Sequence, residues 1–388
     1  MTEWKSYRLA DVCSRLRSGK AISASYVSTN GKYAVVGGNG VRGYTDVSNF
    51  RGQCVVIGRQ GAYCGNVRYF DGEYYMTEHA VVIVGNEYVD THYLAYLLST
   101  MELGHLSAQS AQPGLSIQTL SKLVISLPPM RQQRKIVNML EALDHKIEVN
   151  RCINDNLEQQ AQALYKSWFV DFEPFKDGKF EESEIGLIPE RWCVGKAEDF
   201  YEINIGKTPP RKEHEWFTLD KSQNIWVSIS DLGSDSIFLF DSSEYLTDKA
   251  IQKHNIVLVP ENTVLLSFKL TIGRVGIAGT QLTTNEAIAR FITNSVNREY
   301  TYFLLKNFNY SKLGSTSSIA TAVNSKIIKA MMILMPNDEC LLNFKKLVGP
   351  IIDGIKKNEE EILHLTELRD TLLPKLMSGE LKINEIDC

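Results

Sequence analysis

Two long stretches of the chain place apolar residues at alternating steps of three and four, the spacing of one face of a helix. In residues 131–168 this face carries Ile136, Leu140, Leu143, Ile147, Asn150, Asn154, Leu157, Ala161, Leu164 and Trp168. In residues 339–376 the same spacing gives Phe344, Val348, Ile351, Ile355, Asn358, Ile362, Leu365, Arg369, Leu372 and Leu376. The two faces start 208 positions apart. The sequence therefore predicts one amphipathic helix present twice, each copy packing its narrow apolar seam against the other.

The segments before these helices show shorter periods. Residues 1–127 alternate short apolar runs with glycine-rich loops, which predicts a mixed α/β domain rich in short strands. Residues 192–335 repeat its landmarks: Gly65, Val67 and Glu78 recur as Gly273, Val275 and Glu286, again 208 positions apart. Trp4 and Trp192 are 188 apart, so the second copy holds about twenty extra residues near 208–240. These shared offsets predict a tandem repeat.

The predicted fold class is α+β, with two similar mixed α/β domains separated by two long helices that pair as an antiparallel coiled coil. The expected segments are a first domain (1–127), a central helix (128–170), a linker (171–191), a second domain (192–335), a distal helix (336–378) and a tail (379–388).

The polar layers of the two seams set the predicted register. If the helices pair antiparallel with their midpoints level, facing positions sum to 512, and Asn154 faces Asn358. Asn150, Asn154 and Asn358 are therefore expected to fix the register, because paired amides can satisfy each other inside a seam. The alternative is that these asparagines lie at the edge of the seam and face solvent. Pro374 predicts that the distal helix stops near Leu373 or kinks there, and the start of this helix is left open.

Composition is that of an ordinary globular protein: 388 residues, 44% hydrophobic, 23% charged, with a formal net charge of −4. The acidic excess falls on the two helical segments, and the globular segments are slightly basic. No apolar run is long enough for a membrane span, and the polar N-terminus does not resemble a signal peptide. The seven cysteines form no CxxC pair. They are expected to be reduced thiols in a cytoplasmic protein that contacts no membrane.

Motifs for catalysis are missing. There is no HExxH, and the histidines do not cluster with cysteines, so no metal site is predicted. Gly206, Lys207 and Thr208 resemble the end of a Walker A loop, but Tyr201 occupies the position where that motif needs glycine. No base-methylation signature is present, and Glu380-Leu381-Lys382, half of a nuclease motif, lies in the polar tail. We expect a chain without catalytic residues and without a cofactor of its own.

Polar and basic loops remain as candidate binding sites. Arginine and glutamine can make bidentate hydrogen bonds to base edges, and small polar loops suit phosphate contacts. The candidate DNA-binding residues are Arg42, Arg59, Gln60, Tyr63, Asn66, Arg68, Gln109 and Gln112 in the first domain, and Lys207, Arg211, Lys212, Lys269, Thr271, Arg274 and Ser317 in the second. The competing interpretation is that these are ordinary solvated loops. Because the repeat keeps its scaffold and changes its loop residues, the two copies are expected to bind two different targets.

The chain resembles, over nearly its full length, the specificity subunit of type I restriction-modification systems. The likeness rests on residues 115–150, on WFVDFEPF (168–175), SEIGLIPERW (183–192) and LLPKLMSGEL (372–381), in this order. The resemblance implies that each domain is a target recognition domain reading one half of a split double-stranded DNA sequence. It also implies that two methyltransferase (M) subunits, which bind S-adenosylmethionine, dock around the coiled coil, and that restriction/translocase (R) subunits join them.

A helix of 40 residues is about 60 Å long, which could hold two domains one or two DNA turns of roughly 34 Å apart. A coiled-coil interaction protein whose repeated domains bind protein or peptide is the main alternative. A free-standing DNA-modifying enzyme is disfavoured by the missing motifs.

Overall fold

The computed structural model describes residues 4–107, 114–233, 236–294, 297–313 and 323–382. The chain divides into two compact units, each containing part of both long helices. Unit 1 comprises Met1–Ile147 and His364–Cys388, and unit 2 comprises Glu148–Leu363. The long helices are thus shared between the units rather than forming a body of their own.

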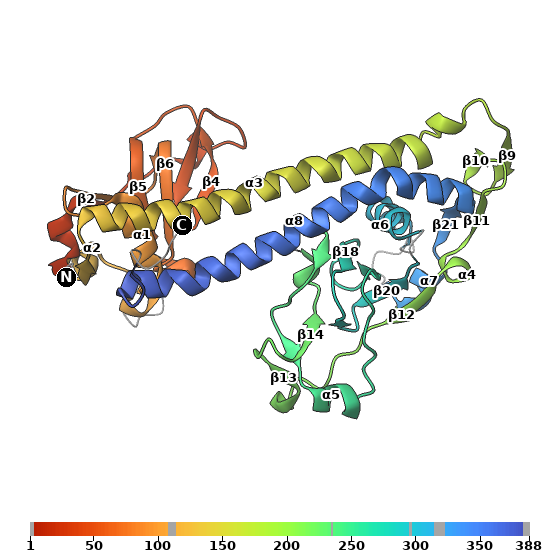
Figure 1. The fold of residues 1–388 in the computed structure, drawn as a ribbon. Helices are drawn as coiled ribbons and strands as arrows, with labels where there is room; N and C mark the ends of the chain where they lie inside the picture. The colour runs from red at the N-terminus through yellow and green to blue at the C-terminus, as the bar shows by residue number, and fades with distance from the viewer. Residues whose placement is uncertain (1–3, 108–113, 234–235, 295–296, 314–322, 383–388) are drawn as a thin grey trace. The chain divides into compact units, whose positions relative to one another are not determined.

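Unit 1 is built on a six-stranded sheet in the order β2-β7-β5-β6-β3-β4 (Figure 1). Its pairs are antiparallel except β3 with β6. The strands are β2 (Cys13–Ser18), β3 (Tyr33–Gly37), β4 (Gly40–Thr45), β5 (Phe50–Gly58), β6 (Val67–Met76) and β7 (Ala80–Gly85). β7 (AVVIVG) and the second half of β5 (CVVIG) are buried apolar runs rich in valine and isoleucine, as expected for strands covered on both faces.

The short helical elements of unit 1 are η1 (Leu9–Val12), η2 (Ala24–Tyr26), η3 (Gly61–Tyr63), α1 (Thr91–Ser99), η4 (Leu103–Leu106) and α2 (Ile117–Ser121). Four of them (η1, α1, η4 and α2) pack against one face of the six-stranded sheet, whereas η2 and η3 bury no residue. Asp90 caps α1 through the backbone N–H groups of His92 and Tyr93. The fully buried Gln133 donates to the carbonyls of Tyr88 and Pro128 and accepts from the Asp90 N–H. This one amide therefore fixes the first turn of the long helix to the start of α1.

Unit 2 contains a five-stranded sheet, β12-β20-β17-β18-β15, and a four-stranded sheet, β13-β16-β14-β19. The strands are β12 (Glu202–Ile205), β13 (Phe217–Thr218), β14 (Asn224–Val227), β15 (Phe238–Leu239), β16 (Tyr245–Leu246), β17 (Val264–Ser267), β18 (Val275–Ala278), β19 (Thr283–Thr284) and β20 (Ile288–Ile292). Three strands of the four-stranded sheet (β13, β14 and β16) and α5 (Asp248–Lys253) lie between β12 and β17, where unit 1 has β3 and β4. The helical elements are completed by α4 (Ala197–Phe200), η6 (His214–Trp216), η7 (Asp231–Gly233), α6 (Arg298–Asn307), η8 (Tyr310–Leu313) and α7 (Ser325–Lys329).

The predicted tandem repeat is visible element by element. Each domain begins and ends in a two-stranded antiparallel sheet, β1 (Lys5–Arg8) with β8 (Val124–Leu127), and β11 (Cys193–Lys196) with β21 (Met332–Met335). α7 follows α2, and β21 follows β8, by 208 residues at both ends. The mixed α/β domains predicted from the sequence are confirmed.

The long helices are α3 (Met130–Phe169) and α8 (Asp338–Ser378). α8 ends at Ser378, as the expected bounds 336–378 have it, and because it passes through Pro374 the alternative of a stop near Leu373 is wrong. Pro374 lies on the exposed face, where the carbonyl that lacks a proline N–H partner can bind water. Gly379, with φ +77°, then terminates the helix against the Trp4 ring.

Within each unit the two helices run antiparallel. In unit 2, Asn150 donates to Glu361 at 2.7 Å and Asn358 donates to Asn154 at 2.8 Å. In unit 1, Arg369 donates to Asp144 at 2.8 Å. The partners in these three pairs sum to 511, 512 and 513, so each unit keeps the register that level midpoints predict.

Residues 171–191 are more ordered than the linker expected from their Pro, Gly and acidic content. They form η5 (Glu173–Phe175) and a hairpin of β9 (Phe180–Ser183) and β10 (Gly186–Pro189). Phe172 and Phe175 pack on Trp192 with ring centroids 5.7 and 5.0 Å apart. The aromatic residues of this segment therefore tie it to the core of unit 2.

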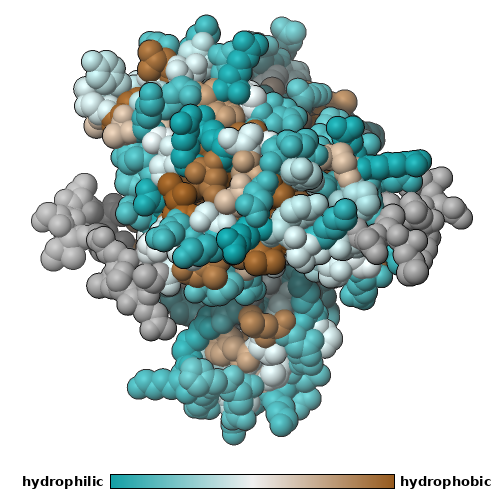
Figure 2. All heavy atoms as spheres, turned by 90° about the vertical axis from the view of Figure 1, so that its left-hand side faces the viewer, coloured by the Kyte–Doolittle hydropathy of each residue, from teal (hydrophilic) through white to brown (hydrophobic). Residues whose placement is uncertain are grey.

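Among the described residues, no helix is both long and apolar enough to cross a bilayer, and no group of acidic, histidine or cysteine side chains is arranged to hold a metal ion. The six cysteines within these residues are free thiols. Figure 2 shows a face on which hydrophilic side chains predominate and hydrophobic ones form small separate groups.

Candidate nucleic-acid interface

Three loops meet at one end of the sheet in unit 1. They follow β2 (Ser18–Lys20), connect β5 to β6 (59–66) and precede β7 (77–79). The Gly19 N–H donates to the Ala80 carbonyl and the Lys20 N–H to the Met76 carbonyl. The Arg59 N–H donates to His79, which joins the second loop to the third. The backbone thus holds the three loops together as one surface.

Unit 2 builds the same surface with different side chains. The Gly206 N–H donates to Ile288 and the Lys207 N–H to Thr284, acceptors that lie 208 positions beyond Ala80 and Met76. The Phe268 N–H donates to Ala287, which joins the β17–β18 loop to the loop before β20. Both glycines are required by close approach, because a Cβ at Gly19 or Gly206 would lie 2.1 Å from a backbone carbonyl oxygen.

Arg42, Arg59 and Arg68 of unit 1 gather around the β3–β4 turn. A Cβ at Gly40 would lie 3.4 Å from the Arg68 guanidinium, and one at Gly37 would lie 3.6 Å from Cδ of Arg42. Both arginines are exposed, on β4 and β6. Arg59 is half-buried and donates to the Ser18 hydroxyl at 3.0 Å. The Arg42 and Arg68 side chains therefore lie beside the β3–β4 turn, and Arg59 lies next to the turn through its backbone while its guanidinium bonds Ser18; these three residues are called the arginine cluster.

The remaining predicted residues of unit 1 surround this cluster. Gln60 is exposed, and its backbone pairs with Gly114 in an isolated bridge. Tyr63 is 54% exposed, and Asn66 is half-buried with its backbone bonded to Gly58 and Tyr63. Gln109 and Gln112, like Ser317 of unit 2, lie outside the described residues.

In unit 2, Lys269 and Thr271 are exposed on the β17–β18 loop. Arg274 of the same loop turns inward, donates to the Ile229 carbonyl at 2.7 Å and covers Gly233. The Arg274 guanidinium is therefore bonded within the protein, and this side chain stabilises the conformation of the loop.

Lys207, Arg211 and Lys212 lie in the loop after β12. Lys207 is exposed, and its ammonium donates to the carbonyls of His254 and Asn255 at the end of α5. Arg211 forms a bidentate pair with Glu244, both bonds at 2.8 Å, and its guanidinium lies 4.1 Å from the Phe217 ring centroid. The bonds to Glu244 raise the pKa of Arg211. Lys212 is exposed.

Lys20 is a loop residue that the sequence reasoning missed. It is exposed and occupies in unit 1 the backbone position that Lys207 occupies in unit 2. The signal was present as two Gly-Lys pairs, at 19–20 and 206–207, but their separation of 187 differs from the offset of 208 that defined the repeat.

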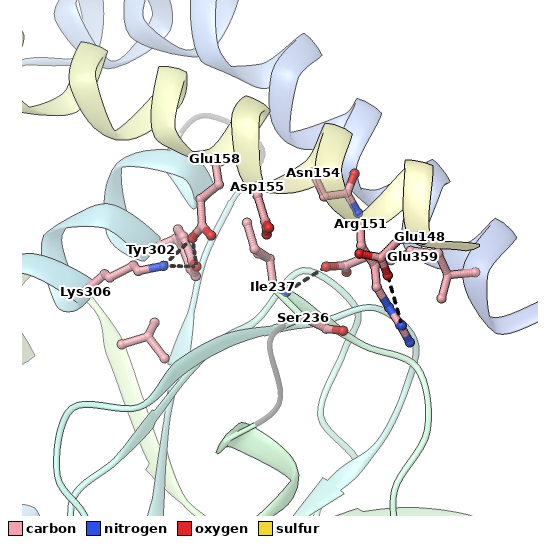
Figure 3. Close-up of a pocket in the computed structure, with 12 residues that line it drawn as sticks. Glu148, Arg151, Asn154, Asp155, Glu158, Ser236, Ile237, Tyr302, Lys306 and Glu359 are labelled. Carbon is pink, nitrogen blue, oxygen red and sulfur yellow. Dashed lines mark hydrogen bonds and ion pairs between the residues drawn. The ribbon is translucent and has the colours of Figure 1, made fainter. Parts of the chain in front are cut away.

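A second polar site in unit 2 lies between the long helices α3 and α8 and the region of β15, β18 and α6 (Figure 3). It is a cavity of about 860 Å³ lined by Glu148, Arg151, Asn154, Asp155, Glu158, Ser236, Ile237, Val275, Tyr302, Lys306, Glu359 and Ile362. Glu158 accepts from Tyr302 at 2.8 Å and from Lys306. This bridge joins α3 to α6.

Glu359 of α8 anchors the edge of the sheet from the opposite helix. Its two carboxylate oxygens accept from the N–H groups of Ile237 and Phe238, each at 2.8 Å. Burial raises the pKa of Glu359 to about 7, although the two N–H bonds favour the charged form. The sequence did not single out this residue, because a buried glutamate on a helix has no distinctive spacing.

Comparison with known proteins gives a consistent result. A family model described as "Type I restriction modification DNA specificity domain" matches residues 1–159 and 189–340. The chain is 28% identical over 319 residues to the type I restriction enzyme MjaIX specificity subunit of Methanocaldococcus jannaschii, covering 78% of this chain and 72% of that protein. It is 26% identical over 331 residues to the HindI specificity subunit of Haemophilus influenzae, covering 69% and 71%.

A solved structure shares the fold. The crystal structure of the type I restriction-modification S subunit from M. genitalium has a TM-score of 0.64 and 16% identity, and covers 97% of this chain and 96% of that chain.

Proposed function

The chain belongs to the family of type I restriction modification DNA specificity domains, and from this premise we propose that it is the DNA-reading subunit of a type I restriction-modification enzyme. Each domain reads one half of a bipartite double-stranded target through its three loops. The paired helices α3 and α8 hold the two readers in register and dock the catalytic subunits.

The observation that carries this proposal is the repeated loop scaffold with changed side chains. The same backbone bonds hold Gly19–Lys20 in unit 1 and Gly206–Lys207 in unit 2. Around them, unit 1 presents an arginine cluster and unit 2 presents Lys269 and Thr271. A duplicated binding surface with different hydrogen-bonding groups suits two different base sequences.

The net charge of the chain suggests that partner subunits contribute to DNA affinity. Arginines can pair bidentately with guanine, and lysines can contact phosphate, but the chain as a whole carries −4. The isolated chain is expected to bind DNA weakly and to gain specific affinity in the assembled enzyme. Two methyltransferase subunits would supply S-adenosylmethionine and catalysis, and restriction/translocase subunits would supply cleavage, so this chain contributes no catalytic residue.

The helices supply the spacing. Each is 40 or 41 residues long, about 60 Å, which is close to two turns of DNA at roughly 34 Å each. Interhelical polar pairs such as Asn154 with Asn358 oppose sliding of one helix along the other. The distance between half-sites is then a property of the helix pair rather than of the reading loops.

Exchange of one domain tests this function. Residues 193–335 would be replaced by the matching segment of a relative with a different target, and methylated sequences would be mapped by single-molecule sequencing in cells that also contain the methyltransferase subunits. One half of the methylated sequence should change while the other half and the spacing persist. The reciprocal exchange of residues 5–127 is the matched control and should change the other half.

Two results would count against the proposal. A change in both halves after a single exchange would show that the domains do not read independently. Binding of a peptide ligand by the loops, with no sequence-specific methylation in the complete system, would favour the interaction-protein alternative.

A further inference from the structure

Leu270 occupies an unusual place at the apex of the β17–β18 loop. Its side chain is 101% exposed, the largest value among the exposed large hydrophobic residues of the described chain. Its backbone has φ +59°, a left-handed conformation that bulky L-residues rarely adopt. Solvent exposure and backbone strain both disfavour leucine at this position, and glycine would relieve both.

The loop holds this conformation through bonds at its base. The buried Ser267 donates its hydroxyl to the Thr271 carbonyl at 2.6 Å and accepts from the Arg274 N–H at 3.0 Å. The Gly273 N–H donates to the Ser267 carbonyl, and the Arg274 guanidinium is fixed on Ile229. Leu270 is therefore presented outward by a preorganised loop, between the exposed Lys269 and Thr271.

The position of the loop indicates what Leu270 meets. The loop lies 208 residues beyond the β5–β6 loop, whose own apex exposes Tyr63 beside the arginine cluster. Both loops thus project one large apolar or aromatic side chain from a polar surface. Apolar side chains on DNA-binding surfaces contact thymine methyl groups or enter between base steps, where they leave water.

We propose that Leu270 is an apolar wedge that packs against the bases of the half-site read by the second domain, with Lys269 beside it on the phosphate backbone. This inference rests on the proposed function and adds a specificity-determining residue to it. Leu270 contributes by entering between two neighbouring bases and partly unstacking them, so it reads the deformability of a base step rather than its hydrogen-bonding edge.

The test uses the assembled methyltransferase complex and a duplex that contains its mapped methylation sequence. Leu270→Gly should lower specific affinity by about 10- to 150-fold, the factor expected when a leucine side chain is no longer buried away from water. Thermal stability should stay the same or rise, because glycine accepts φ +59°. Leu270→Met, which retains apolar bulk, should keep most of the affinity.

Leu219→Gly is the matched control, since Leu219 is 79% exposed in the same domain but lies after β13, outside the three loops. It should leave affinity unchanged. 2-Aminopurine placed along the second half-site should brighten at one step with the wild-type complex and stay dim with Leu270→Gly.

Two outcomes separate failure of the inference from failure of the function. If the wild-type complex binds its sequence specifically and Leu270→Gly binds equally well, the wedge is refuted while the proposed function survives. If the wild-type complex shows no sequence preference, both are overturned.

Discussion

Asn358 of α8 donates its side-chain amide to the side-chain oxygen of Asn154 of α3 at 2.8 Å. Asn154 is 9% exposed, and Leu157 and Ile355 pack in the neighbouring layers of the same seam. A lone amide in this layer would lose its bonds to water without replacement, whereas two facing amides satisfy each other. The pair therefore favours one register of the helices over its neighbours.

Replacing both asparagines tests this role. The variant Asn154→Leu with Asn358→Leu should raise the free energy of unfolding by ~1 kcal/mol, because apolar packing replaces a polar layer. It should also loosen the register, which would appear as methylation of targets whose spacer is one base pair longer or shorter. The single variant Asn358→Leu is the control and should lower stability by about 1–3 kcal/mol, because it leaves the Asn154 amide unpaired. Equal stability of the single and double variants would contradict this account.

The stability of unit 2 should depend on pH through Glu359. Burial raises its pKa from 4.5 to about 7, so between these values the folded chain holds a proton that the unfolded chain has released. The stabilisation that comes from the protonated Glu359 carboxyl is fully present below pH 4.5 and is lost as the pH rises to about 7. Chemical denaturation across this range should show a falling free energy of unfolding.

Glu359→Gln should flatten the pH dependence between 4.5 and 7, since it removes the titrating group. Glu360→Gln is the matched control, because Glu360 is an exposed neighbour on the same helix and its replacement should keep the slope. An unchanged slope in Glu359→Gln would assign the dependence to another group.

Arg211 should behave as a structural residue. Its guanidinium is held by Glu244 and lies over the Phe217 and Trp226 rings, so Arg211→Ala should lower the stability of unit 2 by about 1–2 kcal/mol in thermal denaturation. Lysine cannot reproduce the planar bidentate pair, so Arg211→Lys should be only slightly more stable than Arg211→Ala. Full stability of Arg211→Ala combined with loss of specific DNA binding would instead identify a base-reading residue.

Lys20 and Lys207 should make equivalent phosphate contacts in the two domains. Lys20→Ala and Lys207→Ala should each weaken binding to all DNA sequences alike and reduce the slope of log affinity against log salt by about 0.9 in the assembled enzyme. Lys122, which directly follows α2, and Lys326 of α7 are exposed lysines that serve as controls and should leave the slope unchanged. A change in sequence preference rather than in salt slope would count against phosphate contact.

The parts of the fold that follow from periodic patterns were predictable. The heptad stripes located α3 and α8, and their arithmetic placed Asn154 opposite Asn358. The expected end of the distal helix at residue 378 matches Ser378, but the effect of Pro374 was not predictable, because whether a helix tolerates proline depends on which face is exposed. The hairpin at 180–189 was not predicted, because the Pro, Gly and acidic residues of this region are typical of a linker. Aromatic contacts with Trp192, rather than local propensity, order the region.

The candidate interface was predicted in outline and not in detail. Arg42, Arg59 and Arg68 lie together, yet Arg274 turns inward onto Ile229 and Arg211 onto Glu244. The sequence shows that a loop holds arginine but not which carboxylate or carbonyl lies within reach, because those partners come from distant positions. Lys20 was overlooked because the repeat changes its offset between β2 and β5.

The strand pairs β1 with β8 and β11 with β21 bring the first and last residues of each domain to one place. A gene segment that encodes everything between two such strands can consequently be replaced as a cassette, with its two joints adjacent in the folded chain and the helices untouched. Recombination between related genes at these joints would often yield a chimeric protein that still folds. A new target specificity would then evolve by exchange of a whole domain rather than by accumulation of single substitutions.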